Sequence, residues 1–372
     1  MASVFDPPEF DADSEGLETE HRVVVGDSRR LDALADDSVE LVVTSPPYPL
    51  VEMWDGVFAD LNPAVAGALE RGDGPAAFEA MHAVLDEVWS ELARVLVDGG
   101  IACVNVGDAT RTLDGTFRVY QNHSRIVDAF EARGFDPLPE VLWRKPSNSA
   151  AKFMGSGMVP PNAYVTLEHE YVLAFRNGSQ SREFEPGATC RYEAAYFWEE
   201  RNRWFSDVWT DIRGELQALP GGDLRDRSAA FPFEVPYRLV NMYSVYGDTV
   251  LDPFWGTGTT SLAALVAGRN SVGYERDGEF AGVFAERVAE LPALSRDIVG
   301  TRLADHRAFV ADRRDVGEAF EYEARHYDVP VTTKQEQSIR LYEVETVEST
   351  DGGYRASHVP VSGGGCARES DS

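Results

Sequence analysis

The segment from Val250 to Glu275 constrains the fold of this 372-residue chain more than any other. A short apolar run ends at Asp252 and is followed by a turn that contains Gly256 and Gly258. The next residues read as an apolar helix, and a second apolar run leads to Glu275. Two such runs joined by a glycine turn and a helix are typical of neighbouring parallel strands. The segment therefore predicts an α/β fold rather than a helical bundle or a sandwich.

The same segment carries residues suited to a nucleotide-like ligand. Gly256 and Gly258 would let the backbone approach a ligand closely. Thr259 or Thr260 could cap the following helix, whose free N–H groups would face the turn. The carboxylate of Glu275, at the end of the next strand, is suited to bind two ribose hydroxyls.

A second motif, Thr-Ser-Pro-Pro-Tyr at residues 44–48, follows the apolar run 39–43. The two prolines stiffen this turn, because each fixes its own φ and restricts the preceding residue. The Ser45 hydroxyl and a backbone carbonyl of the turn could each accept an N–H from an exocyclic amino group, which would direct the nitrogen lone pair at an electrophile. The ring of Tyr48 offers a flat face to a base swung out of a duplex.

The two motifs together resemble the beta group of S-adenosyl-L-methionine-dependent DNA amino-methyltransferases, in which the catalytic motif precedes the cofactor motif. Segments 23–28, 142–146 and 230–236 also resemble motifs of that group, so the likeness covers roughly residues 22–290. It implies a doubly wound, Rossmann-like methyltransferase sheet with an inserted target recognition subdomain. It also implies S-adenosyl-L-methionine as methyl donor and double-stranded DNA as partner.

The resemblance implies a role for each matching residue. The catalytic residues would be Ser45, Pro46, Pro47 and Tyr48. The cofactor-binding residues would be Asp27, Thr44, Phe231, Asp252, Pro253, Phe254, Gly256, Gly258, Thr259 and Glu275.

Ser45 favours N4 of cytosine as the methylated atom, because family members with serine at this position are mostly cytosine-N4 enzymes. Adenine N6 stays an alternative, since a carboxylate and a hydroxyl can both accept an N–H. Methylation at cytosine C5 is excluded, because it needs a thiolate that typically follows a proline, and none of the three cysteines does. A non-catalytic DNA-binding protein of the same fold is a further alternative, although the intact motifs argue against it. The histidines form no close pair, so no metal site is expected.

The charge of the chain points to concentrated salt. There are 63 acidic and 34 basic residues, with a formal net charge of −29, and only three of the basic residues are lysine. Abundant carboxylates keep a protein soluble where salt screens their repulsion, so we expect a halophile's protein. The alternative is an ordinary acidic protein with no nucleic-acid partner, because this net charge opposes phosphate binding at low salt.

Residues 149–228 have 9 basic and 12 acidic side chains, against 25 and 51 in the rest of the chain. Aromatic residues from Tyr192 to Trp209 alternate there with arginines, and both types can contact an opened duplex. We predict a target recognition insert in this range. The aromatic residues could equally be the core of a small subdomain.

Spacing and composition divide the chain further. Apolar residues at helical spacing predict a helix at 77–97, and strands are expected at 101–106, 171–175 and 339–347. The expected parts are an acidic flexible tail (1–20), the catalytic half (21–148), the insert (149–228), the cofactor-binding half (229–295), a C-terminal extension (296–348) and a flexible tail (349–372). The acidic start is no signal peptide and no apolar stretch reaches the length of a membrane span, so we expect a cytoplasmic protein. A homodimer and a cognate restriction enzyme stay open, and no motif indicates a nuclease.

Overall fold

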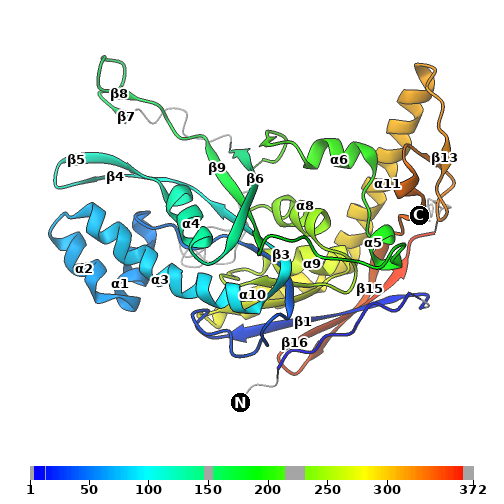
Figure 1. The fold of residues 1–372 in the computed structure, drawn as a ribbon, viewed down its shortest axis with the longest axis horizontal. Coiled ribbons are helices and arrows are strands. Elements are labelled where there is room, and N and C mark those ends of the chain that lie inside the picture. The colour runs from blue at the N-terminus through cyan, green and yellow to red at the C-terminus, as the bar shows by residue number, and fades with distance from the viewer. Residues whose placement is uncertain (1–3, 13, 146–153, 214–230, 363–372) are drawn as a thin grey trace, which may run out of the picture.

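The computed structural model describes residues 4–12, 14–145, 154–213 and 231–362. In this part of the chain a ten-stranded sheet forms the centre of the molecule (Figure 1). Across the sheet the strands are Val208–Trp209 (β10), Phe135–Arg144 (β6), His169–Asn177 (β9), Leu96–Val106 (β3), Val39–Thr44 (β2), Thr249–Asp252 (β11), Asn270–Glu275 (β12), Leu17–Val25 (β1), Gly353–Pro360 (β16) and Tyr342–Thr350 (β15). Smaller pairs are Ala109–Leu113 (β4) with Thr116–Tyr120 (β5), Met154–Gly155 (β7) with Ala163–Tyr164 (β8), and Tyr322–Glu323 (β13) with Pro330–Val331 (β14).

The directions of the strands show where a ligand can bind. Strands β3, β2, β11, β12 and β1 are parallel. The chain continues from β2 to β3 and from β11 to β12, so the connections of the adjacent strands β2 and β11 diverge. Such a divergence opens a crevice at the carboxyl ends of the strands, where open α/β sheets bind their ligands. Strand β9 is antiparallel to β3 and β6, so its first residues lie at the same edge.

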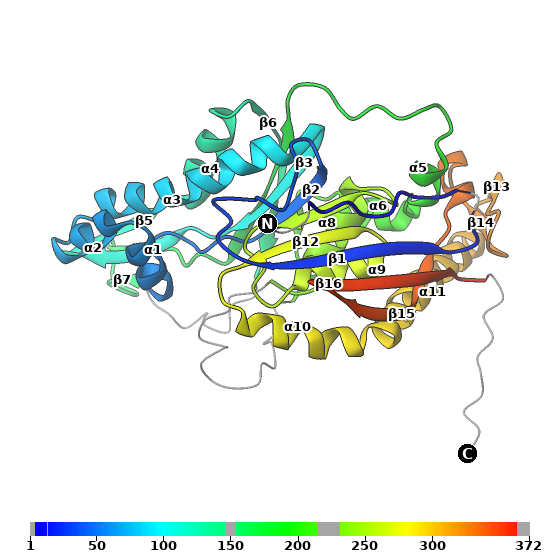
Figure 2. The same cartoon turned by 90° about the horizontal axis from the view of Figure 1, so that it is seen from below.

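Helices cover both faces of the sheet (Figures 1 and 2). They are Asp55–Leu61 (α1), Pro63–Glu70 (α2), Gly74–Val95 (α3), Asn122–Glu131 (α4), Thr189–Glu193 (α5), Trp198–Trp204 (α6), Glu234–Tyr243 (α8), Thr259–Ala267 (α9), Glu279–Ala289 (α10) and Leu291–Asp315 (α11), with 3-10 turns at Glu52–Trp54 (η1) and Lys334–Ser338 (η2). Alternate side chains of β2 enter two cores: Val42 packs in the cluster that holds α3 and α4, and Val43 in the one that holds α8 and α9. The predicted doubly wound α/β fold is confirmed.

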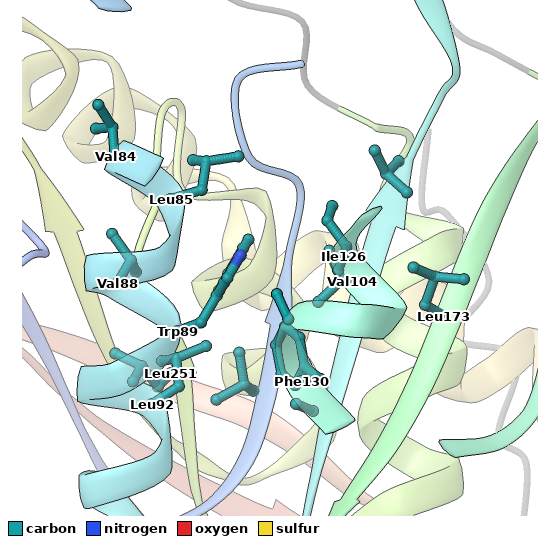
Figure 3. Packing of buried hydrophobic residues seen from close by; sticks show 14 of the residues in the cluster. Val84, Leu85, Val88, Trp89, Leu92, Val104, Ile126, Phe130, Leu173 and Leu251 are labelled. Carbon is teal, nitrogen blue, oxygen red and sulfur yellow. The ribbon is translucent and has the colours of Figure 1, made fainter. Parts of the chain in front are cut away.

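Packing of α3 positions part of the crevice. The side chain of Asp73 caps this helix by accepting from the N–H of Ala76, and the helix begins slightly earlier than the predicted residue 77. Trp89 is fully buried, with its ring 5.1 Å from that of Phe130 and 5.9 Å from that of Phe254. Figure 3 shows Trp89 and Phe130 among aliphatic side chains of α3 and the sheet. This core therefore packs against Phe254 through Trp89.

The predicted flexible tail 1–20 is wrong for its described residues. Phe5 is buried, and Leu17 begins β1, which pairs with β12 and β16. The physical reason is that buried and exposed side chains alternate along β1, which the acidic composition of the segment does not reveal. Leu17 and Thr19 point inward, whereas the intervening Glu18 is exposed.

The predicted flexible tail 349–372 is likewise wrong up to residue 362, and residues 363–372 lie outside the described part. Strands β15 and β16 form an antiparallel hairpin that continues the sheet beside β1 (Figure 2). The strand predicted at 339–347 is therefore present, shifted to Tyr342–Thr350. Helix α11 ties this extension to α6 through a buried ion pair, in which Arg302 Nε lies 2.6 Å from Glu200 Oε1.

The predicted insert 149–228 is not a separate unit in its described residues. Strands β9 and β10 fall inside these boundaries, yet they pair with β3 and β6 in the central sheet. The loop that carries β7 and β8 does extend away from the sheet (Figure 1). Residues 146–153 and 214–230 lie outside the described part. None of the described helices is long and apolar enough to cross a membrane.

Candidate functional site

A cavity of about 310 Å³ opens at the carboxyl ends of β2 and β11. Its volume is typical of small-molecule sites. Most of the residues that the sequence analysis selected line it: Asp27, Ser45, Pro46, Pro47, Tyr48, Phe231, Asp252, Pro253, Phe254, Gly256, Thr259 and Glu275. Thr44 and Gly258 are not in its wall. The proline motif and the glycine turn, far apart in the sequence, thus bound one cavity.

Thr44 joins the two motifs from behind the cavity. Its buried hydroxyl donates to Asp252 Oδ1 over 2.6 Å, across 208 positions of sequence. The backbone N–H of Phe254 donates to the same oxygen over 3.0 Å. Burial raises the pKa of Asp252 to about 6, although these hydrogen bonds oppose the shift. Thr44 and Asp252 therefore lock the ends of β2 and β11 together.

The two glycines of the turn have different tasks. Gly256 has a φ of +51° and lines the cavity, and a Cβ at this position would have no heavy atom closer than 3.9 Å. Gly258 has a φ of +75°, and a Cβ there would lie 2.3 Å from the ring of Phe284. Gly258 consequently allows the turn to pack against Phe284. Of the two glycines, only Gly256 is placed to contact a ligand in the cavity.

The wall offers groups that fit S-adenosyl-L-methionine. Glu275 accepts from the N–H groups of Gly256 and Asp277, each over 2.9 Å, and its remaining lone pairs can accept from hydroxyls. Asp27 forms an ion pair with Arg29 at 2.8 Å, and this hydrogen bond lowers the pKa of the Asp27 carboxyl. The apolar rings of the wall can cover the rest of such a ligand. The residues present fit the cofactor that the motifs imply.

A hydrogen-bonded network surrounds the turn at residues 44–48, which we call the proline corner. Ser45 Oγ lies 3.0 Å from Tyr48 Oη, which donates to Glu170 Oε2 over 3.1 Å. Asn105 Nδ2 donates to Tyr48 Oη over 2.9 Å and to Glu170 Oε2 over 2.7 Å. Lys145 Nζ donates to Glu170 Oε1 over 2.6 Å. The carboxylate of Glu170, at the start of β9, thus contacts residues at or just after the ends of β2, β3 and β6.

The carboxylate sets the direction of the hydrogen bonds. Burial and the charge of Glu170 raise the pKa of Tyr48 well above its usual value, so the phenol keeps its proton. Because ionised Glu170 can only accept, the single proton of Tyr48 is directed to it. Ser45 must then donate to Tyr48, which leaves the lone pairs of Ser45 Oγ free to accept from a ligand.

Sequence reasoning selected none of Glu170, Lys145 and Asn105 as site residues. Glu170 directly precedes the strand expected at 171–175 and is the second residue of β9. Asn105 Oδ1 is buried and has no hydrogen-bond partner among the described residues. Polar residues at strand ends were the available signal, but the antiparallel direction of β9 cannot be read from its sequence.

None of the clustered aromatic residues and arginines of the predicted insert lines the cavity. Trp204 and Trp209 are buried, as in the alternative that makes them core residues. Tyr192, Trp198 and Arg191 line a second hollow, whose wall also contains Gly99 at the start of β3 and Arg176 at the end of β9. That hollow is at the opposite edge of the sheet. These exposed members therefore lie away from the site, whereas Trp209 on β10 pairs with Trp143 near the carboxyl end of β6, at the edge of the sheet that carries the site.

Comparison with known proteins points to one family. A family model described as "DNA methylase", for N6 and N4 methyltransferases, matches residues 39–286. The chain is 50% identical to the Type II methyltransferase M.MthZI of Methanothermobacter thermautotrophicus over 328 residues, which are 88% of this chain and 91% of that protein. It is 48% identical to the Type II methyltransferase M.MjaI of Methanocaldococcus jannaschii over 283 residues, which are 73% and 92% of the two chains.

A solved structure shares the fold. It is a putative DNA modification methylase from Thermus thermophilus in complex with S-adenosyl-L-methionine. The TM-score is 0.56 at 33% sequence identity, and the match covers 72% of this chain and 92% of that one.

Proposed function

This chain belongs to the N6 and N4 DNA methylase family, and we propose that it transfers the methyl group of S-adenosyl-L-methionine to N4 of cytosine in a short site of duplex DNA. The target base would leave the duplex and enter the cavity, because the amino group is out of reach inside a stacked helix. The names of the two relatives support a place in a type II modification system. The charge of −29 supports a cellular environment of concentrated salt.

One observation carries the proposal: the proline corner and the glycine turn line the same cavity at the divergence of β2 and β11. In this assignment Gly256, Glu275, Asp27 and Phe231 hold the cofactor, which supplies an electrophilic methyl group. Asp252 and Thr44 keep the two motifs in register. Gly258 allows the turn to pack.

Ser45 Oγ and the Pro46 carbonyl are the acceptors for the two N–H bonds of the target amino group. Each accepted hydrogen bond draws electron density onto the nitrogen and disfavours delocalisation of its lone pair into the ring. Since Ser45 already donates its own proton to Tyr48, it meets the amino group as an acceptor. The rigid Pro46-Pro47 turn holds both acceptors in place before the base arrives, which lowers the cost of orientation.

Tyr48 has two tasks in this assignment. Its ring lines the cavity and offers a face to the base. Its hydroxyl is fully used by Ser45, Asn105 and Glu170. Glu170 and Asn105 are positioning residues, because they act on the amino group only through Tyr48 and Ser45.

The choice of cytosine N4 over adenine N6 is supported by Ser45, as the neutral acceptor at the first motif position. The test is to incubate the purified protein with labelled S-adenosyl-L-methionine and duplex DNA in concentrated KCl and to digest the DNA to nucleosides. We expect N4-methylcytosine, formed far more slowly by Ser45→Ala than by the parent. N6-methyladenine would overturn the target assignment. No methylated nucleoside from the parent protein over a range of sites and salt concentrations would favour a DNA-binding protein without activity.

A further inference from the structure

We propose that the hairpins β4–β5 and β7–β8 form one surface that contacts duplex DNA beside the target base. We call it the hairpin surface, and it consists of Phe117, Arg118, Val119, Met158, Val159, Tyr164 and Val165. The inference rests on the proposed function, since it assigns the partner of the same site. It moves the expected DNA contact away from the exposed aromatic and arginine residues at the opposite edge of the sheet.

The two hairpins act as one structural element. The rings of Phe117 on β5 and Tyr164 on β8 are stacked, with centroids 5.1 Å apart and planes at 4°. Both hairpins lie on the side of the molecule that carries α1 and α2 in Figures 1 and 2. Aromatic stacking between two otherwise separate hairpins gives the surface a defined shape.

The hairpin surface is connected to the cavity. Strand β4 begins three residues after the end of β3, whose Asn105 belongs to the network at the proline corner. Arg111 on β4 makes two hydrogen bonds to Asp55 of α1, at 2.6 and 2.7 Å. Helix α1 contributes Val57 and Phe58 to the cavity wall. A duplex lying on the hairpins is therefore beside the mouth of the site.

Apolar side chains are exposed here to an unusual extent. The exposed fractions are 37% for Phe117, 47% for Tyr164 and 40% for Val119, and they rise to 65% for Val159, 83% for Val165 and 84% for Met158. A soluble protein rarely leaves such neighbouring side chains in water unless they meet a partner. Apolar wedges of this kind insert at opened base steps in DNA complexes.

The charge distribution selects nucleic acid as this partner. The sequence from 154 to 167, which carries β7 and β8, contains no aspartate or glutamate, in a chain with 63 of them. Arg118 is exposed on β5 and forms no ion pair among the described residues; its guanidinium lies 5.7 Å from the ring of Tyr120. An acid-free stretch beside an unpaired arginine suits phosphates, and the acidic remainder of the surface repels them.

Aromatic and basic members of the surface predict different effects on binding. Phe117 and Tyr164 would contact bases or sugars, and their contribution depends little on salt. Arg118 would neutralise a phosphate, so its loss should lower the slope of log Kd against log salt concentration by about 1.

The experiment measures Kd for a duplex that the parent protein methylates, by fluorescence anisotropy over a series of KCl concentrations. Phe117→Ala and Tyr164→Ala should each weaken binding about tenfold with the slope unchanged. Arg118→Gln should lower the slope. Trp198→Ala, at the opposite edge of the sheet, is the matched control for an exposed aromatic residue, and Tyr164→Phe should keep parental affinity because it keeps the stacked ring.

Unchanged melting temperature and cofactor affinity would show that the variants are folded. If Phe117→Ala and Tyr164→Ala both bind DNA within twofold of the parent, the hairpin surface is overturned while methylation by the parent still supports the proposed function. If they change the oligomeric state and leave DNA affinity intact, the surface is an interface between copies of the chain and the inference is also wrong. Failure of the parent to methylate any DNA would instead refute the proposed function.

Discussion

Replacing Glu170 with glutamine tests the hydrogen-bond direction at the proline corner. Glu170 accepts from Tyr48, Asn105 and Lys145 at 3.1, 2.7 and 2.6 Å. A glutamine has one acceptor oxygen. If that oxygen faces Tyr48, the amide NH₂ meets the Lys145 ammonium. If the NH₂ faces Tyr48, the phenol must donate to Ser45 instead, and Ser45 loses an acceptor lone pair.

The expected size of the effect follows from the bond that is lost. A hydrogen bond to a charged group contributes about 1.5–3 kcal/mol. Since each 1.4 kcal/mol in the barrier is tenfold in rate, the single-turnover rate of methyl transfer should fall about 10- to 100-fold. Affinity for S-adenosyl-L-methionine should stay within about twofold of the parent, because Glu170 is not in the cavity wall.

The assay is transfer of labelled methyl to duplex DNA at saturating protein, with cofactor binding measured by calorimetry. Glu168→Gln is the matched control, since this residue is on the same segment but pairs with exposed Arg144 at 3.2 Å, outside the network. Parental rates for Glu170→Gln would refute the reasoning about direction. A large loss of cofactor affinity would show that Glu170 acts on the cavity as a whole.

Three further outcomes are expected. Gly258→Ala should lower the free energy of unfolding by about 2–4 kcal/mol in urea titrations, because it combines a left-handed φ with a clash at Phe284, whereas Gly256→Ala should cost less stability and more cofactor affinity. Glu40→Gln should raise the melting temperature at pH 8 but not at pH 4.5. Burial raises the pKa of Glu40 to about 7, so the parent loses up to about 3 kcal/mol of folding stability as the pH rises from 4.5 through 7. Equal melting curves for parent and variant at both pH values would contradict this. Glu200→Ala should destabilise the protein by about 3–5 kcal/mol, because it leaves the buried charge of Arg302 without its carboxylate partner; a calorimetric loss no larger than that of the exposed-pair variant Glu318→Ala would contradict this.

The sequence predicted those parts of the site that are contiguous in it. The turn at 44–48 and the turn at 252–258 each follow a short apolar run. The carboxyl ends of the two runs lie at the same edge of the sheet because the strands are parallel. The family resemblance implied that the two turns form one site, and the parallel strands explain why they do. The separate task of Gly258 could not be inferred, because its close neighbour Phe284 comes from α10.

The network around Glu170 was beyond local reasoning for a different reason. Its members come from four strands, and only the antiparallel placement of β9 between β3 and β6 brings Glu170 to Asn105 and Lys145. The chain ends were misjudged because acidic residues on the outer side of β1 concealed its inward-facing positions. Thr19 Oγ1 of β1 lies 2.9 Å from His358 Nε2, across 339 positions of sequence. No local sequence pattern predicts such a contact.

The central claim is that the Ser45 hydroxyl accepts a hydrogen bond from the target amino group beside a separately held cofactor. Its most direct test is to measure, for Ser45→Ala, the single-turnover rate of methyl transfer together with the Kd for S-adenosyl-L-methionine. We predict a rate about 100- to 1,000-fold below that of the parent, as for the loss of a positioned polar group in other active sites, with a Kd changed by less than about twofold. A parental rate, or a loss of rate explained entirely by weaker cofactor binding, would contradict the account.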